Sequence, residues 1–291
     1  MTTALVVTYN SARWIDHCLT SLEGVATIVV DNASNDETPS IVRDRHPDVR
    51  LLVRPRNGGF AVAVNDGTRA APGEDILLIN PDVVVRPGSV GILDAYLSDH
   101  ARVGIVVPRL LNPDGSVQAN VRTFPTPLTM LARRSPLGRT GHGQKILRDH
   151  FLADGGSPVA RPVPAVTGAV MLVRRATIEA IGPMDERIFL YGEDWDWCYR
   201  AWAAGWEVHI EPKAVMDHEY ERQSRRTLDL RSAAVRHHWA SALKLAAIHP
   251  GLLVGRMPVG ARDAARWQPA STSTTSLEPS PHRTGDRRRR H

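Results

Sequence analysis

The stretch ALVVTYN, residues 4–10, is where the fold of this chain is decided. Its run of apolar and β-branched residues, with no polar alternation, predicts a strand that is buried on both faces. Four more runs of this kind follow, and segments with helical periodicity separate them. This alternation predicts an open α/β sheet of parallel strands covered by helices. The expected strands are 4–8, 26–31, 49–53, 75–79 and 103–107, and the expected helices are 12–22, 37–46, 59–71 and 87–98.

The pattern changes after residue 108. NPDGS at 112–116 predicts a hairpin turn, and residues 122–162, rich in Arg, Pro and Gly without a clear period, predict a long loop. Later segments predict strands at 169–175 and 206–210 and helices at 194–204 and 228–248. From about 261 the composition becomes low in complexity, which predicts disorder. We therefore expect a main domain, 1–225, a C-terminal helical extension, 226–260, and a disordered tail, 261–291.

Composition narrows the class of protein. The chain has 291 residues, 42% of them hydrophobic, and 36 basic against 31 acidic side chains give a net charge of +5. A mildly basic surface suits a nucleotide or an anionic membrane, and without a nucleic-acid-binding motif we expect no nucleic-acid partner. Cys18 and Cys198 form neither a disulfide framework nor a zinc motif, which indicates a cytoplasmic protein. We find neither a signal peptide nor an apolar run near the ~18 residues of a membrane span.

Polar residues follow four successive strands of the expected sheet. Any one of these segments alone is explained by turn or capping chemistry. Four in succession predict one polar crevice, because parallel strands end at the same edge and open α/β sheets bind ligands there. The segments are TYN (8–10), DNASND (31–36), RNGGFAVAVNDG (56–67) and NPD (80–82).

The chemistry of these segments suits a nucleotide. Asp31 can accept hydrogen bonds from a base or a ribose, and Gly58 and Gly59 let the backbone approach a ligand closely. The helix that follows would direct its N-terminal amides at phosphate. Asp82 is placed to hold a hard divalent cation through oxygen. Neither GxGxxG nor GxxxxGK[ST] occurs, which counts against a dinucleotide or P-loop site.

The stretch FLYGEDWDWCYRAWAAGW, residues 189–206, combines three acids with four tryptophans. An amphipathic helix explains much of it, because Asp196 can pair with Arg200 four residues on, and Glu193 and Asp194 suit a positive helix N-terminus. A helix does not require two adjacent acids behind FLYG among aromatic residues. An acceptor sugar requires aromatic faces and a carboxylate that takes its proton.

Taken in order, these motifs resemble those of the family 2 glycosyltransferases with the GT-A fold, over about residues 3–225. Within the family, VPRLLNPDGSVQ (107–118) is similar to bacterial rhamnosyltransferases that act on lipid-linked cell-wall or polysaccharide precursors. The resemblance implies a Rossmann-like α/β fold with a mainly parallel nucleotide-sugar-binding sheet. The matching segments are VVTYN (6–10), DNASND (31–36), NGGFAVAVNDG (57–67), LLINPDV (77–83), TGAVMLVRR (167–175), FLYGEDWDWCYRAWAAGW (189–206) and HEYERQS (218–224).

The resemblance also implies an activity and roles for residues. It indicates an inverting, metal-dependent transfer of a sugar, best L-rhamnose from dTDP-rhamnose, to polyprenyl-diphosphate-linked N-acetylglucosamine or another cell-envelope glycan. Asp194 would be the general base, Glu193 and Trp195 would bind the acceptor, and Asp82 with His218 would hold Mg²⁺ or Mn²⁺. Asn80 stands where the family's DxD signature has its first acid, which removes one charge from the metal site. The nucleotide-sugar contacts would be Thr8, Asn10, Asp31, Asn32, Asn57, Gly58, Gly59, Asn65 and Asn80.

The sequence leaves two alternative functions open. The same fold serves a UDP-hexose donor with another polysaccharide acceptor, or a non-catalytic nucleotide-sugar-binding protein. A sugar nucleotidyltransferase is disfavoured, because VTYNSARW (7–14) lacks a Gly-rich loop followed by a basic residue.

Alternatives for single segments also remain. His218 by itself is either a metal ligand or a structural histidine. Arg222, Arg225 and Arg226 either grip phosphate or form a solvated face. Residues 239–255 either pack on the core or lie on a membrane, which would place the protein on the inner face of the plasma membrane.

Overall fold

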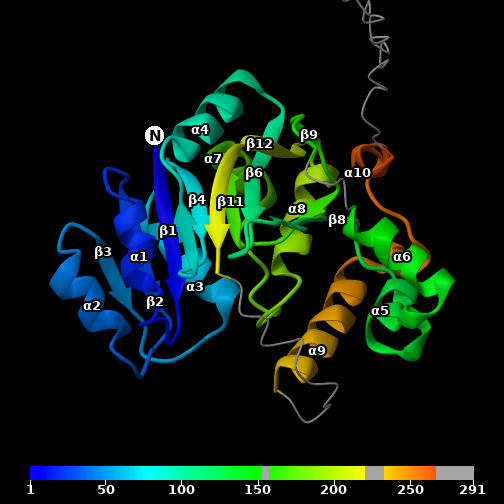
Figure 1. The fold of residues 1–291 in the computed structure, drawn as a ribbon, viewed down its shortest axis with the longest axis horizontal. Helices are drawn as coiled ribbons and strands as arrows, with labels where there is room; N and C mark the ends of the chain where they lie inside the picture. The colour runs from blue at the N-terminus through cyan, green and yellow to red at the C-terminus, as the bar shows by residue number, and fades with distance from the viewer. Residues whose placement is uncertain (153–156, 220–232, 267–291) are drawn as a thin grey trace, which may run out of the picture.

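A computed structural model describes residues 1–152, 157–219 and 233–266. A mixed sheet forms its centre, with helices on both faces (Figure 1). Its strand order is β3-β2-β1-β4-β11-β6-β12-β5, with β7 paired to β6 and β9 to β12. The strands are β1 (Thr2–Thr8), β2 (Thr27–Asp31), β3 (Arg50–Val53), β4 (Asp75–Ile79), β5 (Val83–Val85), β6 (Val103–Leu111), β7 (Val117–Gln118), β9 (Arg161–Pro162), β11 (Val170–Val173) and β12 (Glu207–His218), and a separate pair joins β8 (Val121–Arg122) to β10 (Ala165–Val166).

The N-terminal half of the sheet confirms the expected parallel arrangement. Strands β3, β2, β1 and β4 are parallel neighbours, and the register places Thr8 opposite Asp31. The other half is mixed, since β11 is antiparallel to both β4 and β6, whereas β6 and β12 are parallel. An apolar run indicates burial on both faces, and a strand covered by helices is buried in this way whichever direction it takes.

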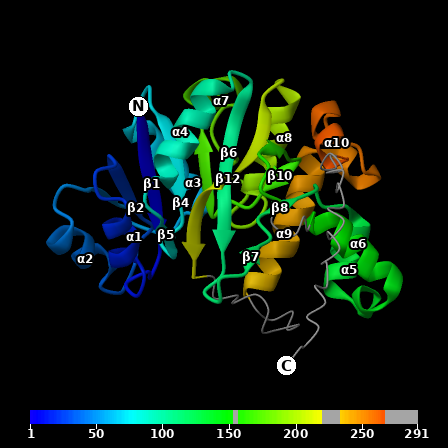
Figure 2. The same cartoon turned by 45° about the horizontal axis from the view of Figure 1, so that its top comes forward.

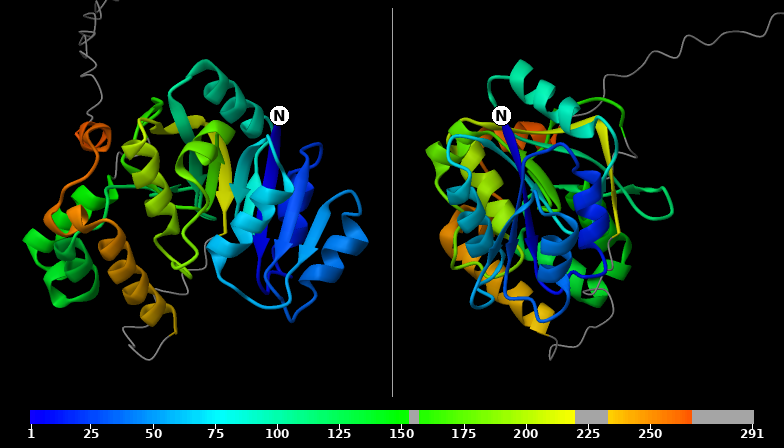
Figure 3. Two further views of the ribbon diagram at one scale, coloured as in Figure 1. Left: turned by 180° about the vertical axis from the view of Figure 1, so that it is seen from behind. Right: turned by 90° about the vertical axis from the view of Figure 1, so that its left-hand side faces the viewer.

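Helices cover both faces of the sheet, as Figure 3 shows from behind and from the side. Side chains alternate along β1, so that Leu5 and Val7 join one apolar cluster while Ala4 and Val6 join the other. The first cluster includes residues of α3 (Phe60–Ala70), α7 (Arg175–Ile181) and α8 (Glu193–Ala203). The second includes residues of α1 (Ile15–Ser21), α2 (Thr38–Arg45) and α4 (Ser89–Asp99).

The prediction of a long loop at 122–162 is wrong. The segment contains α5 (Pro127–Arg134), a 3₁₀ turn η1 (Pro136–Arg139) and α6 (Gly141–Phe151), which lie beside α9 (Ala233–Ile248) in Figures 1 and 2. The hydroxyl oxygen of Thr126 accepts a bond from the backbone N–H of Thr129 at 3.2 Å, and that of Thr140 accepts one from Gly143 at 3.1 Å. These N-caps start two helices within a segment whose Arg, Pro and Gly content led to the prediction of a loop.

The later segments agree with the expectations in part. NPDGS does form a hairpin, between β6 and β7, but β12 runs on to His218 instead of ending at 210. Helix α9 ends at Ile248 before HPG, as expected, and 228–232 lie outside the described residues. The expected boundary at 261 falls inside α10 (Val259–Ala265). In the described part of the chain, no helix is long and apolar enough to cross a membrane.

Candidate active site

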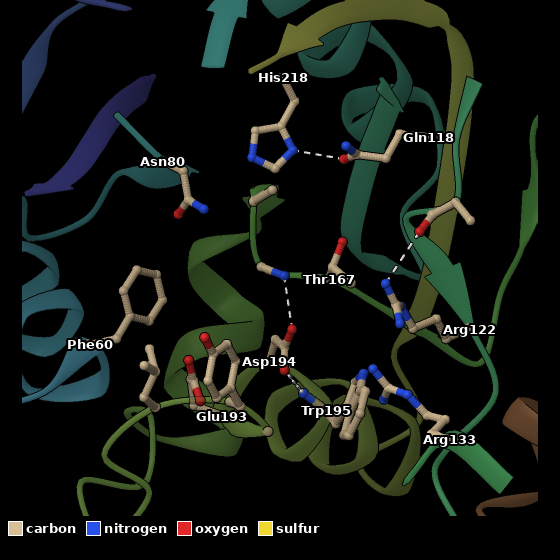
Figure 4. Close-up of a pocket in the computed structure, with 16 residues that line it drawn as sticks. Phe60, Asn80, Gln118, Arg122, Arg133, Thr167, Glu193, Asp194, Trp195 and His218 are labelled. Carbon is tan, nitrogen blue, oxygen red and sulfur yellow. Dashed lines mark hydrogen bonds between the residues drawn. The ribbon is translucent and has the colours of Figure 1, made fainter. Parts of the chain in front are cut away.

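A cavity of about 240 Å³ lies beside the carboxyl end of β4 (Figure 4). Its walls come from segments that are far apart in the sequence, including the β6–β7 hairpin, β8, α5, the N-terminus of α8 and the end of β12. It brings together five of the residues expected from the sequence, two of them acids at the start of α8. These five are Asn80, Glu193, Asp194, Trp195 and His218.

Two backbone N–H groups hold the Asp194 carboxylate in this cavity. Gly168 donates to its Oδ2 at 2.9 Å and Trp195 donates to its Oδ1 at 2.8 Å (Figure 4). A Cβ on Gly168 would come within 3.3 Å of the Cβ of Asp194, so a larger residue there would crowd the acid. Burial raises the pKa of Asp194, while the two N–H bonds and the charge of Arg122 act in the opposite direction. A carboxylate tuned in this way is suited to accept a proton.

Glu193 differs from its neighbour Asp194 in its environment. It is 5% exposed, and its Oε2 has no hydrogen-bond partner among the described residues. Burial, with the nearby Asp194 charge, raises the pKa of Glu193 to about 8. The site therefore pairs a carboxyl that stays protonated at neutral pH with one that two N–H donors favour in its ionised form.

Two backbone hydrogen bonds connect Asp194 to the end of β4 through the residues just before β11. The N–H of Asn80 donates to the carbonyl of Ala169 at 2.9 Å, immediately before β11. The next residue back, Gly168, donates to Asp194. Asn80 and Asp194 therefore line one cavity and are both attached to the same short backbone segment, residues 168–169.

The pairing of β5 with β12 brings Asp82 and His218 together. His218 lies opposite Val83 in the register, and its Nε2 is 3.3 Å from Oδ1 of Asp82. The His218 side chain is 4% exposed, and it faces the cavity (Figure 4). Two residues that are far apart in the sequence thus present a nitrogen and a carboxylate oxygen to one point.

A chain of hydrogen bonds from the hairpin sets the orientation of His218. Ser116 donates its hydroxyl to Asp114 at 2.5 Å, so it accepts from the amide of Asn112 at 2.9 Å. The carboxamide oxygen of Asn112 then accepts from Gln118 at 3.0 Å. Consequently, Oε1 of Gln118 accepts from Nδ1–H of His218 at 2.7 Å. In neutral His218 the lone pair is therefore on Nε2, which faces Asp82.

This donor set fits a divalent cation. Two ligands at right angles around an ion with bond lengths of ~2.1 Å lie about 3 Å apart, close to the 3.3 Å between the two donor atoms. The described residues contain no cluster of three or more His, Cys, Asp or Glu side chains suited to a metal. Phosphate oxygens and water would supply the other ligands, as is usual for Mg²⁺.

Four of the residues expected to bind the nucleotide, Thr8, Asn10, Asp31 and Asn32, lie at the ends of β1 and β2, outside the cavity lining. Thr8 and Asp31 are fully buried, and the Asp31 carboxylate accepts from the hydroxyl of Thr8 at 3.0 Å and from Ser34 at 2.9 Å. Asn32, 3% exposed, accepts from the N–H of Gly58 at 3.1 Å. These three side chains therefore brace the loops of the crevice. Exposed Asn10, which has a φ of 52°, lies at its surface.

The glycine loop and the helix α3 that follows it both contact the segment before α8. Asn57 accepts from the N–H of Gly59 at 3.0 Å, and a Cβ on Gly59 would lie 2.7 Å from the carbonyl oxygen of Phe189, so the loop packs tightly against the segment before α8. Asn65 is 2% exposed and both ends of its carboxamide bond to Met184. Asn65 therefore connects α3 to the chain before α8, and both atoms of its carboxamide are used in these bonds.

Asp196 has the structural role that helical spacing indicates. It pairs with Arg200 at 2.6 Å and with His249 at 2.7 Å, and its side chain is 1% exposed. Trp195 contacts both the cavity and the core. It is 7% exposed and lines the cavity, and its ring packs edge-on against His150, with 6.3 Å between the ring centroids.

Sequence reasoning missed several cavity residues. Gln118 lies inside the quoted stretch VPRLLNPDGSVQ, but its partner His218 is 100 residues away and no local pattern connects them. Arg122 and Arg133 lie in the segment taken for a loop. The Thr-Pro step at 126–127 is a helix-start signal that would have predicted α5. Arg222, Arg225 and Arg226, considered for phosphate, lie outside the described residues.

Comparisons with known proteins agree with this geometry. A family model described as "Glycosyltransferase like family 2" matches residues 2–239. The chain belongs to the family 2 glycosyltransferases. This confirms the resemblance carried by the motifs, and it identifies the protein as an enzyme.

Two curated relatives of this glycosyltransferase are informative. The N-acetylglucosaminyl-diphospho-decaprenol L-rhamnosyltransferase of Mycobacterium tuberculosis is 32% identical over 266 residues, which cover 85% of this chain and 84% of the relative. The dTDP-rhamnosyl transferase RfbF of Shigella flexneri is 27% identical, over 74% of this chain and 68% of the relative.

Solved structures confirm the GT-A fold. The mannosyltransferase PcManGT from Pyrobaculum calidifontis, in complex with GDP-Man and Mn²⁺, has a TM-score of 0.51 at 20% identity, covering 90% of this chain and 78% of that one. S. aureus TarS 1-349 in complex with UDP has a TM-score of 0.51 at 18% identity, covering 75% and 60%. A divalent cation thus accompanies the fold in one of these structures.

Proposed function

We propose that this glycosyltransferase transfers L-rhamnose from dTDP-rhamnose to a polyprenyl-diphosphate-linked N-acetylglucosamine, with inversion at the anomeric carbon. The observation that supports the reaction type is the Asp194 carboxylate, which Gly168 and Trp195 hold in the cavity that Asn80 also lines. The mycobacterial relative, 32% identical, supports the choice of substrates.

In the proposed mechanism, Asp194 accepts the proton of the attacking acceptor hydroxyl. A positioned base typically accelerates such a step by ~10²–10⁴-fold. Glu193, protonated at neutral pH, donates a hydrogen bond to the acceptor sugar, and Trp195 offers it an apolar wall. Asn80 binds the donor, and the glycine loop at Asn57 lets its backbone approach the nucleotide.

Asp82 and His218 would hold the divalent cation. A bound cation would neutralise charge on the leaving nucleoside diphosphate. The role of the protein is to keep both ligands aimed at one point, which the hairpin bonds to His218 achieve. Contact of the enzyme with the inner face of the plasma membrane, where such acceptors reside, is part of the same proposal.

The test is nucleoside diphosphate release from dTDP-rhamnose, UDP-glucose, UDP-galactose and UDP-N-acetylglucosamine, each with and without a prenyl-diphosphate N-acetylglucosamine acceptor. We expect acceptor-dependent turnover of dTDP-rhamnose alone, and its loss with chelator. Turnover of a UDP-hexose would keep the mechanism and refute the rhamnose assignment. Nucleotide binding without turnover of any donor would favour a non-catalytic nucleotide-sugar-binding protein.

A further inference from the structure

Two arginines line the cavity on the acceptor side. Arg122 is on β8 and Arg133 is on α5, and both line the cavity with Trp195. The ring of Phe151 fixes both guanidinium groups, whose carbons lie 4.9 and 5.8 Å from its centroid. A single aromatic ring on α6 thus keeps two cations on one wall of the cavity.

The position of the arginine pair relative to the base is informative. In Figure 4, Arg122 and Arg133 lie beyond Asp194 and Trp195 as seen from Asn80. Arg122 is also close enough to Asp194 to oppose the rise in its pKa. The order across the cavity is therefore donor-side amide, general base and arginine pair.

The histidine beside the arginine pair adds no charge of its own. Burial, followed by the charges of Arg133 and Arg122, lowers the pKa of His150 to about 3, so this histidine stays neutral beside them. Guanidinium groups bind phosphate oxygens through paired, charge-assisted hydrogen bonds. Two such groups in one partly buried cavity match an anion with several oxygens.

We propose that Arg122 and Arg133 form the subsite for the diphosphate of the acceptor, an inference that rests on the proposed function. With the attacking hydroxyl of the acceptor sugar at Asp194, the diphosphate is on another ring carbon of the same sugar, the anomeric one, and so lies within about one sugar ring of the base. The arginine pair lies beyond Asp194, on the side away from Asn80.

Helix α5, which bears Arg133, leaves Leu128 46% and Leu131 51% exposed. The two leucines are three residues apart and lie on one side of the helix, whereas Arg133, two residues after Leu131, lies on the opposite side. The leucines are therefore not part of the arginine subsite, and the calorimetric measurement below distinguishes the diphosphate of the acceptor from that of the donor.

The experiment compares two acceptors that carry the same N-acetylglucosamine. One is a short-chain prenyl diphosphate, and the other is the neutral octyl glycoside. Rhamnosyl transfer to each is measured for the wild type, Arg122→Gln, Arg133→Gln and the double variant. The control is Arg148→Gln, which changes an exposed arginine of α6 that does not line the cavity.

We expect the wild type to prefer the diphosphate acceptor in kcat/KM. Each Gln variant should reduce that preference by roughly 10-fold or more, since a charge-assisted hydrogen bond is lost. The Arg→Lys variants should recover part of it, and Arg148→Gln should match the wild type. The ratio of the two acceptors cancels any effect of Arg122 on the base Asp194, because both acceptors use the same base.

Three results would overturn the inference. A wild-type enzyme that does not distinguish the acceptors would refute the subsite and leave the proposed function standing. A variant that loses nucleoside diphosphate affinity, measured by calorimetry, would assign the arginines to the donor instead. No transfer to either acceptor would refute the proposed function together with the subsite. If Arg122→Gln fails to fold, Arg133→Gln decides alone, since α5 lies outside the central sheet.

Discussion

Replacing Asp194 by Asn tests whether this residue acts in proton transfer or in nucleotide binding. The new carboxamide would keep one acceptor oxygen, whereas the Asp194 carboxylate accepts from both Gly168 at 2.9 Å and Trp195 at 2.8 Å. One backbone N–H therefore loses its partner, which costs about 1–3 kcal/mol. Removal of a carboxylate whose pKa is raised by burial offsets part of that cost. We expect the free energy of unfolding to fall by no more than about 3 kcal/mol.

The effect on catalysis should be much larger than the effect on binding. Loss of the general base should lower turnover by roughly 10²–10⁴-fold. Nucleoside diphosphate affinity should change by less than about threefold, because the proposed nucleotide and cation contacts are Asn80 and Asp82 and not Asp194. Sugar transfer is measured with saturating donor, and nucleotide affinity by calorimetry on the same preparation.

Asp196→Asn is the matched control, because it removes an acid two residues further along the same helix. Asp196 is 1% exposed and pairs with Arg200 and His249, so its loss should destabilise the protein by about 3–5 kcal/mol. The folded fraction should retain its turnover. The reasoning is refuted if Asp194→Asn keeps turnover within tenfold of the wild type, or loses nucleotide affinity together with turnover.

Three further predictions concern stability and the metal. Burial and the charge of Asp194 raise the folded-state pKa of Glu193 to about 8, so the wild type loses stability as pH rises from 4.5 to 8. The advantage of Glu193→Gln in thermal unfolding should therefore grow over that window by up to about 5 kcal/mol, and a constant difference would contradict the prediction. Gln118→Leu removes the acceptor of His218 Nδ1–H, so Mn²⁺-dependent nucleoside diphosphate affinity by calorimetry should fall about 10–100-fold, and Gln118→Glu should retain more of it. Gly59→Ala, whose Cβ would lie 2.7 Å from a backbone oxygen, should lower stability by about 1–3 kcal/mol, and more than Gly73→Ala, which has nothing within 4 Å.

The sequence was most informative where burial and chain direction act locally. The first four strands and their helices follow from apolar runs and periodicity, and the register of Thr8 with Asp31 gathers the expected crevice. The role of these two residues could not be predicted from the sequence. Position indicates that Asp31 lies at the ligand edge, but only packing shows that it is fully buried and bonded to the loop.

Contacts between distant segments set the limit of sequence reasoning. His218 has its orientation from Gln118, and the two residues come together only because β7 and β12 both flank β6. Arg133 was missed for another reason. Its helix lies in a segment rich in Arg, Pro and Gly, which favoured a loop, and the start of the helix depends on the cap at Thr126.

The mixed half of the sheet explains why the strand-end rule found only part of the site. The rule places ligands at the carboxyl ends of parallel strands, and Asn80 and Asp82 follow β4 there. Strand β11 is antiparallel to β4, so its amino end lies at that same edge and brings Gly168 beside Asn80. A parallel β11 of four residues would carry its amino end roughly 13 Å away along the strand. The reversal of this one strand therefore brings the backbone N–H that holds Asp194 close to Asn80, and the position of the proposed general base depends on it.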